Sequence, residues 1–482
     1  MSAVSQIPTP ASAQVDSSCR AALLVLLISS GIWLLLASAF GIISSLAFHA
    51  PALFADCAAL SYGRAKPAGM NAFLYGFCLQ AGMGVALWLF AHIGRTRLAH
   101  SAMIIVGAAL LNLGVTVGVL GILSGDSTGF EILEMPRYAA ALLFIGYVLV
   151  GAAAAVTLHR RVPGTLSIPH WFLITALFWF PWIYSSANLL LGGPPVRGVT
   201  QAVIDWWYAN NFQFVWLTLV GLGTAFYFVP RLAKRPVHNL YLAALAFWML
   251  ILFGSWGGVP NNSPVPAWLP ALSTVGTVLT LVPIIAVAMN MCSTACCGRS
   301  ENLLPEDKTP FQFILFGLAA FVVAGITNAV TSLIQVSPWT DLTWLVVAKN
   351  QLQTYGFFAM VIFGAIYVVV PGFMGERIFC PKLMRWHFRL AVIGIILFVL
   401  PLAIGGVVQG TQLQHATTPF ADIMKRGVLF LRVSTMGEAF IAMGNLLFVI
   451  NLVGGVGRHY RAEAVTVYMA ATADLHSEGM RS

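Results

Sequence analysis

The stretch FRLAVIGIILFVLPLAIGGVVQ (residues 388–409) decides the class of fold, because it carries no charged side chain between Leu390 and Val408. An α-helix rises 1.5 Å per residue, so about 20 such residues cross the roughly 30 Å hydrocarbon core of a bilayer. The same pattern recurs on both sides of this stretch along the whole chain. The apolar runs predict twelve membrane-spanning helices, over residues 21–46, 70–92, 101–124, 138–158, 169–192, 210–230, 239–258, 267–291, 311–334, 343–371, 388–409 and 428–455.

The composition agrees with a chain that lies in lipid. Of the 482 residues, 59% are hydrophobic and 9% are charged, and the mean hydropathy is +0.86. Soluble domains have about 45–50% apolar and 25% charged residues, so this chain has too few polar residues to coat a water-exposed surface. The sequence therefore predicts an all-α integral membrane protein, a single bundle of about twelve transmembrane helices. Lipid surrounds it, and we expect no nucleic acid among its partners.

The basic residues are distributed unevenly between the two sides of the predicted bundle. Seventeen of the 25 Lys and Arg residues fall on the side of the amino terminus, and six fall on the opposite side. Cytoplasmic loops carry the excess of Lys and Arg, so the net charge of +9 reports orientation rather than an acidic ligand. We expect a multi-pass protein of a bacterial inner membrane with cytoplasmic tails at 1–20 and 457–482, a twelve-helix domain at 21–456, and no second domain.

Histidines are the residues that a bundle would need to hold heme or copper in its interior. The chain has ten of them, and all are predicted to lie in loops or at helix ends. Ionisable groups at membrane depth are costly and often mark function, so those within the spans carry more information. The residue pattern alone predicts no metal-ligating or catalytic residue.

A polar cluster interrupts the predicted span at 343–371. Its members are Lys349, Asn350, Gln351, Gln353 and Thr354. Residues 349 and 353 share a helix face, as do 350 and 353 or 354, so the cluster can point into the bundle. One interpretation is a proton or ion site, or an unusual lysine ligand to heme. The other is an interior hydrogen-bonding cluster that fills space.

Glu438 is the deepest carboxylate of the predicted span at 428–455. A buried carboxylate can relay protons, since burial shifts its titration. It can equally accept hydrogen bonds from a neighbouring helix or contact a partner subunit. The sequence leaves these roles open.

Five ordered motifs resemble subunit I of the heme-copper oxidase superfamily, closest to the catalytic subunit of cbb3-type cytochrome c oxidases and their nitric oxide reductase relatives. The motifs are YGRAKPAGMNAF (62–73), DWWYANNF (205–212), FYFVPRLAKRPVHNLYLAALAFW (226–248), SWGGVPNN (255–262) and GFFAMVIFGAIYVVVPGFM (356–374). The resemblance covers most of the chain and implies the family's helical bundle. Function does not follow from fold alone.

The chain departs from the family at the cofactor ligands. The resemblance implies six ligand histidines, and the corresponding positions hold Gly69, Asn210, Asn261, Asn262, Lys349 and Gln351. The first position corresponds to a ligand of the low-spin heme, the next three to copper ligands, and the last two to one ligand for each heme. Carboxamides are poor ligands for copper and heme iron, but they can hydrogen-bond with one another in a vacated cavity.

These departures lead to three hypotheses. The first is a cofactor-free, non-catalytic scaffold of a respiratory electron-transfer complex that anchors a c-type cytochrome or another redox subunit. The second is a proton or ion conduit that uses Lys349 and Glu438, with Asn350 and Gln353 in the same polar network. The third is an active cytochrome c oxidase or nitric oxide reductase subunit that binds heme b and copper with unusual ligation.

Overall fold

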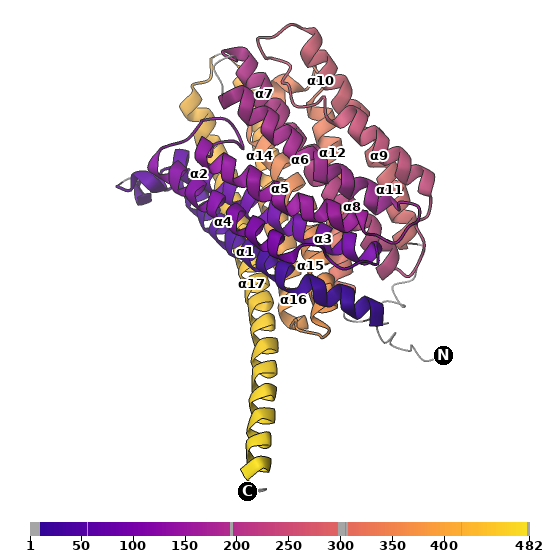
Figure 1. The fold of residues 1–482 in the computed structure, drawn as a ribbon. Coiled ribbons are helices and arrows are strands. Elements are labelled where there is room, and N and C mark those ends of the chain that lie inside the picture. Colours follow the sequence, from indigo (N-terminus) through magenta and orange to yellow (C-terminus); the bar gives the residue numbers. More distant parts are fainter. Residues whose placement is uncertain are drawn as a thin grey trace.

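The protein is almost entirely helical in the computed structural model, which describes residues 10–54, 56–192, 196–296, 304, 307–415 and 417–479 (Figure 1). The α-helices are α1 (Pro10–Ala47), α2 (Tyr62–Asn71), α3 (Gln80–Ile93), α4 (Ser101–Ser124), α5 (Arg137–His159), α6 (Ile168–Gly192), α7 (Val199–Asn210), α8 (Leu217–Leu232), α9 (Leu240–Gly254), α10 (Trp268–Leu279), α11 (Leu281–Cys296), α12 (Lys308–Thr331), α13 (Ser337–Thr340), α14 (Trp344–Gln351), α15 (Met360–Met374), α16 (Pro381–Leu413) and α17 (Phe420–Gly479). Two short 3-10 helices are η1 (Pro51–Phe54) and η2 (Ala58–Leu60), and three π-helical segments are η3 (Ala72–Leu79), η4 (Asn211–Trp216) and η6 (Leu352–Ala359).

Eleven helical stretches of the described chain are long and apolar enough to cross a membrane, which confirms the predicted all-α membrane bundle. The one predicted span that is not among these eleven, 239–258, contains only the 15-residue helix α9. A helix of that length covers about 22 Å, less than the roughly 30 Å of hydrocarbon. The prediction ran too far because the run stays apolar after Gly254, whereas Gly258 takes a left-handed backbone with φ of 104° and Pro260 follows it.

The helices extend past both predicted ends of the bundle. Helix α1 begins at Pro10, and α17 runs as one helix of 60 residues to Gly479. Figure 1 shows the last part of α17 projecting from the bundle, at the end where α1 begins. Residues 1–9 and 480–482 of the predicted tails lie outside the described residues. The base of the projection is attached to α1, because the Arg20 guanidinium lies 3.7 Å from the Glu463 carboxylate.

Small residues allow the last two long helices to pack closely. A Cβ atom at position 437 would lie 2.5 Å from the backbone N of Phe398 and 2.8 Å from the carbonyl O of Gly394. A Cβ atom at position 394 would in turn lie 2.8 Å from the backbone N of Ile441. Membrane helices associate through such close backbone contacts, because lipid provides no hydrophobic driving force between them. Glycine at 394 and 437 therefore sets the distance between α16 and α17.

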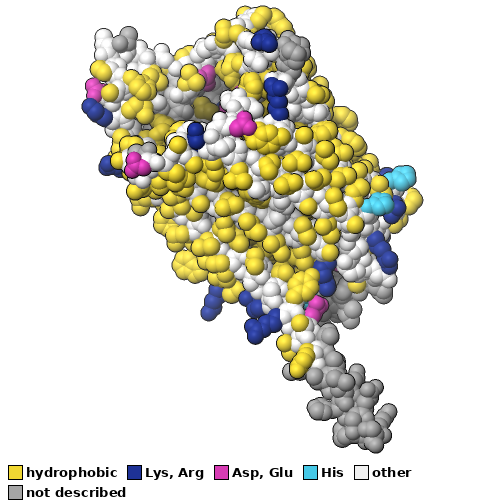
Figure 2. Space-filling model, turned by 60° about the vertical axis from the view of Figure 1, so that its left-hand side comes forward, with side chains coloured by type: hydrophobic (Ala, Val, Ile, Leu, Met, Phe, Trp, Pro, Cys, Tyr) yellow, Lys and Arg dark blue, Asp and Glu magenta, His cyan; other side chains and the backbone are white. Residues whose placement is uncertain are grey.

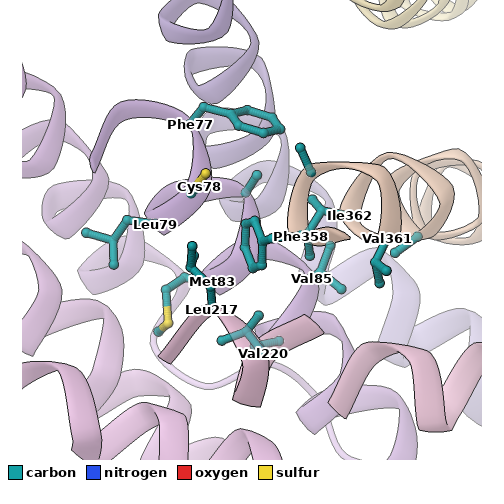
Figure 3. Packing of buried hydrophobic residues seen from close by; sticks show 14 of the residues in the cluster. Phe77, Cys78, Leu79, Met83, Val85, Leu217, Val220, Phe358, Val361 and Ile362 are labelled. Carbon is teal, nitrogen blue, oxygen red and sulfur yellow. The ribbon is translucent and has the colours of Figure 1, made fainter. Parts of the chain in front are cut away.

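The centre of the bundle is filled by side chains from three parts of the chain. Figure 3 shows Cys78 and Met83 on the η3 to α3 segment, Val220 on α8 and Phe358 on η6 gathered around one point. All four side chains are at most 2% exposed. A Cβ atom at position 82 would lie 3.1 Å from the Phe358 ring, so the segments are close-packed here. This packing fixes the position of α14 and η6 between the two cavities described below.

The surface is that of a membrane protein. Figure 2 shows a broad hydrophobic band across the middle of this face, with Lys and Arg side chains gathered toward its two ends. Side chains of a bilayer-spanning bundle are expected to divide in this way. The same view shows the molecule hollowed at the end remote from the projecting part of α17, with acidic side chains near the hollow.

Candidate functional site

The largest candidate site is a cavity of about 450 Å³ formed by α7, η4, α10, α12, α14 and the loop after α9. We call it the asparagine cavity. The asparagines in its wall are Asn210, Asn261, Asn262, Asn328 and Asn350. Lys349 also lines it, so the cavity brings together four of the six positions that the resemblance assigned to ligands. The three predicted copper positions and Lys349, one of the two heme-ligand positions implied in the span at 343–371, thus share one site.

The carboxamides of this cavity bond mainly to the backbone. Asn210 donates from Nδ2 to the carbonyl O of Gly254 at 2.8 Å, and Asn261 donates to the carbonyl O of Ser332 at 2.8 Å. The Thr274 hydroxyl donates to Asn261 Oδ1 at 2.9 Å. Among the described residues, these side chains do not bond to one another, contrary to the sequence-based expectation. They instead tie the loop after α9 to α12 and hold the wall of the cavity in place.

Lys349 is the one lysine in the wall of the asparagine cavity. Its ammonium donates to Asn328 Oδ1 at 2.9 Å and lies 5.8 Å from the centre of the Phe214 ring. An ammonium has three donors, so this single hydrogen bond leaves two that can serve another group. The carboxylates of Glu131 and Asp341 also line the cavity. The site therefore combines one cation, two acidic groups and several amides.

The remaining two predicted ligand positions meet on the other side of α14. Gly69 and Gln351 line a pocket of about 60 Å³ between α1, α2, η6 and α17, which we call the Gly69 pocket. Gln351 points away from the asparagine cavity because residues two apart on a helix do not share a face. The structure thus separates the six positions into a group of four and a group of two.

The Gly69 pocket is narrow because α1 lies directly against α2. A Cβ atom at position 69 would lie 2.9 Å from the Cβ of Phe40 and 3.5 Å from the carbonyl O of Ala37. Separations below 3.0 Å require one of the two atoms to move. Glycine is therefore the residue that lets these two helices touch. Any larger side chain at 69 has to displace Phe40.

Polar groups line the rest of the Gly69 pocket. The Tyr355 hydroxyl donates to Asn445 Oδ1 at 2.5 Å, and Asn445 Nδ2 donates to the Ser38 hydroxyl at 2.9 Å. Lys66 and Glu438 line this pocket and an adjoining hollow of about 60 Å³. The pocket is thus lined by a hydrogen-bonded chain, a lysine and a buried carboxyl group.

The predicted polar network is divided by the structure. Lys349 and Asn350 line the asparagine cavity. Gln353 lines a smaller cavity of about 30 Å³ that shares Asn210 with it, and donates to the Thr218 hydroxyl at 3.0 Å. Glu438 instead lines the Gly69 pocket. Lys349 and Asn350 thus share one cavity, Gln353 lines a neighbouring one, and Glu438 lies at the Gly69 pocket on the other side of α14.

Three π-helical segments lie next to these positions, and no residue pattern predicted them. Segment η4 begins directly after Asn210, and η6 begins directly after Gln351. Segment η3 begins three residues after Gly69. Wider turns of this kind occur frequently at functional sites because they re-aim side chains. The three π-helical segments therefore lie beside Gly69, Asn210 and Gln351, which are three of the six positions named from the motifs.

The loop between α4 and α5 contributes acidic groups that sequence reasoning missed. Glu131 reaches the asparagine cavity, and its backbone N–H donates to Asp205 Oδ2 at 3.1 Å. Glu134 Oε2 accepts a hydrogen bond of 2.7 Å from Asn71 Nδ2, and burial raises the pKa of the Glu134 carboxyl to about 7. The signal available in the sequence was the run FEILEM (130–135), where Ile132 and Leu133 separate the two glutamates. In the structure Ile132 is fully buried. Apolar residues in a short loop indicate that the loop enters the bundle.

No histidine with a described side chain lines the asparagine cavity or the Gly69 pocket. Two histidines differ from the expectation that all lie in loops or at helix ends. His387 is fully buried within α16 and lies 2.9 Å from the Tyr367 hydroxyl. His459 lies within α17 and contacts Glu376, because that helix continues where a tail was predicted.

Taken together, the apolar helices and the cavities between them define a polytopic integral membrane protein. Residues 21–440 match the family described as cytochrome c and quinol oxidase polypeptide I. The chain therefore belongs to this family, the heme-copper oxidase subunit I family.

The chain is similar to known oxidase subunits over most of its own length and most of theirs. Cytochrome c oxidase subunit 1 of Rhodobacter capsulatus is 24% identical over 86% of this chain and 80% of its own. The cbb3-type cytochrome c oxidase subunit CcoN1 of Stutzerimonas stutzeri is 25% identical over 79% of this chain and 81% of its own. A solved structure of a heme-copper terminal oxidase dimer has the same fold, with a TM-score of 0.66 and 13% identity over 90% of this chain and 83% of that one.

Proposed function

We propose that this protein is a cofactor-free, subunit I-like scaffold of a respiratory electron-transfer complex in a bacterial inner membrane. In this role it anchors a c-type cytochrome or another redox subunit and does not itself catalyse oxygen or nitric oxide reduction. Family membership supports the assignment to a respiratory assembly, since its relatives are named as subunits of cytochrome c oxidases.

The observation that carries the proposal is the chemistry of the cavity walls. At the six positions where the resemblance implies histidine ligands, this chain has Gly69, Gln351, Lys349 and three asparagines. Heme iron and copper in proteins of this kind rely on imidazole, and carboxamides bind them poorly. The residues present therefore do not fit two hemes and a copper ion.

The size of the Gly69 pocket supports the same conclusion. Its volume is about 60 Å³. Sites for organic cofactors usually measure about 300–1,000 Å³. The contact between Gly69 and Phe40 keeps α1 and α2 too close for a ligand side chain at this position.

The proposed orientation places both termini in the cytoplasm, following the distribution of Lys and Arg. The beginning of α1 and the projecting part of α17 lie at one end of the bundle (Figure 1). The asparagine cavity then opens toward the periplasm through the loop that contains Asn262. A c-type cytochrome is expected to bind on that side.

The test is a visible spectrum, a heme extraction assay and a metal analysis on the purified chain, followed by capture from native membranes in mild detergent. We expect no stoichiometric heme or copper in the chain, and co-purification of a c-type cytochrome or another redox subunit. Recovery of the protein alone would reject the scaffold role. Stoichiometric heme b with copper would instead favour an active oxidase or nitric oxide reductase with unusual ligation.

A proton or ion conduit is the second candidate. Lys349, Glu131 and Asp341 favour it because three ionisable groups line one cavity that is large enough for several waters. Glu438 lies on the other side of α14, so the two residues first suggested do not form one path. Proton flux in liposomes tests this candidate, and flux that is unchanged in Lys349→Met and Glu438→Gln would reject a role for either residue.

A further inference from the structure

A separate hollow lies at the ends of two membrane-spanning helices. It measures about 370 Å³ and is formed by the loop 126–136, the start of α5 and the last turn of α6. It shares no lining residue with the asparagine cavity or the Gly69 pocket. Both helices are long and apolar enough to cross a membrane, and α5 begins where α6 ends. The hollow therefore lies at the boundary between hydrocarbon and water, the depth of lipid headgroups.

One side of the hollow is basic. Arg137 lines it, and its Nε lies 3.6 Å from where a Cβ atom at Gly192 would be, so its side chain reaches across to the end of α6. Among the described residues, the Arg137 side chain has no hydrogen bond or ion pair. No side chain caps the start of α5 at Pro136, and the free N–H groups of a helix start favour an anion. Asn188 lines the hollow one turn before Gly192 on the same face of α6, so an amide lies beside the guanidinium.

The other side of the hollow is acidic. Asp126 lines it from the loop after α4, and the Tyr138 hydroxyl interacts with its carboxylate. No basic group of the described residues lies within 4.0 Å of that carboxylate, Arg137 included. Asp126 and Arg137 thus line one hollow without forming an ion pair. A group that carries both charges can lie between them and contact each.

An apolar surface adjoins the hollow on its lipid side. Leu133 and Leu191 line the hollow and are at most 7% exposed. Leu189 and Leu190, between Asn188 and Leu191 on α6, are 74% and 40% exposed. Because α6 spans the membrane, these two side chains face hydrocarbon. A molecule held in the hollow can therefore extend apolar chains along α6.

We propose that this hollow binds a phospholipid whose headgroup carries a phosphate and a primary ammonium, the chemistry of phosphatidylethanolamine. The phosphate contacts Arg137, Asn188 and the start of α5, and the ammonium donates to Asp126. Two carbon atoms separate the phosphate from the ammonium, which suits two protein charges that line one hollow without pairing. The acyl chains follow Leu189 and Leu190. The site is additional to the proposed scaffold role and does not depend on what the asparagine cavity holds.

The test is native mass spectrometry of the delipidated full chain in detergent, with three lipids that carry the same acyl chains. Phosphatidylcholine keeps both charges but has no N–H donor, and phosphatidylglycerol keeps the phosphate but has no cation. We expect Kd for phosphatidylethanolamine to be at least about tenfold lower than for either. Equal Kd values for the three lipids would overturn the proposed site. Soluble phosphoethanolamine should compete at least about tenfold more weakly than the lipid, and equal competition would overturn a lipid as the occupant.

Variants locate the site and separate its two charges. Arg137→Gln should raise Kd for phosphatidylethanolamine at least about tenfold. Asp126→Asn should abolish the preference over phosphatidylglycerol, because it removes the partner of the ammonium alone. Arg426→Gln makes the first change at an exposed arginine of α17 outside the hollow, and should leave Kd unchanged. All three positions are exposed, so the variants are expected to fold. Unchanged binding in Arg137→Gln, or an unchanged preference in Asp126→Asn, would overturn the proposal.

Discussion

Replacing Gly69 by alanine tests whether close packing of α1 against α2 closes the Gly69 pocket. In an ordinary helix interior, alanine is more favourable than glycine by about 1 kcal/mol. At position 69 the new Cβ would lie 2.9 Å from the Phe40 Cβ, and overpacking of this kind costs about 1–3 kcal/mol. The two effects leave an expected net loss of about 1 kcal/mol in the free energy of unfolding.

Gly63→Ala provides the matched control on the same helix. A Cβ atom at position 63 would meet no other atom within 4 Å, so this variant is expected to gain up to about 1 kcal/mol. The assay is unfolding in mixed micelles by titration with SDS, followed by tryptophan fluorescence and circular dichroism. The two substitutions should therefore change stability in opposite directions.

A double-mutant cycle with Phe40→Gly identifies the contact itself. Glycine at position 40 removes the Cβ atom that the new methyl group at position 69 would meet, so the cost of Gly69→Ala should fall. We expect a coupling free energy of at least about 1 kcal/mol between the two positions. Stabilisation by Gly69→Ala equal to that of Gly63→Ala, or additivity in the cycle, would refute the argument that Gly69 closes the pocket.

Three further predictions concern other contacts. Gly437→Leu should lower the free energy of unfolding by about 1–3 kcal/mol, because the new side chain separates α16 from α17. Gly427→Leu is the control and should not lower it, because a Cβ atom at position 427 would meet no other atom within 4 Å. Equal losses in the SDS titration would contradict the described packing. Tyr355→Phe leaves Asn445 Oδ1 without its donor and should cost about 1–3 kcal/mol, a loss that should disappear in an Asn445→Leu background. Burial raises the pKa of Glu134 from 4.5 to about 7, so ionisation opposes folding and stability should fall as pH rises through this window. Glu134→Gln keeps an acceptor for Asn71 and should remove that part of the pH dependence in thermal unfolding, and an unchanged pH profile would show that Glu134 does not cause it.

Hydropathy predicts the bundle because a membrane-spanning helix needs a long apolar run, and this rule found every long helix. Hydropathy does not predict where a helix ends when backbone geometry or helix propensity sets the end. Helix α9 ends at Gly254 through backbone geometry, although the residues that follow are still apolar. Helix α17 continues past Val456 because residues such as Ala462, Glu463 and Ala464 favour helix even though the segment is not apolar.

The candidate site was partly predictable for similar reasons. Motif order located Gly69, Asn210 and Gln351, and the structure places them beside the two cavities. No sequence rule identifies a π-helical turn or the depth to which the loop around Glu131 enters the bundle, because both depend on packing between distant segments.

The continuous helix α17 also has a mechanical consequence. Its 60 residues correspond to about 90 Å, roughly three times the thickness of the hydrocarbon core. A helix turns by about 100° per residue, so the azimuth of any group on the projecting part is coupled to that of the buried part. Inserting one residue beyond Arg461 would rotate the distal part by about 100° and advance it by only about 1.5 Å. The helix therefore transmits rotation as well as distance to whatever binds its far end.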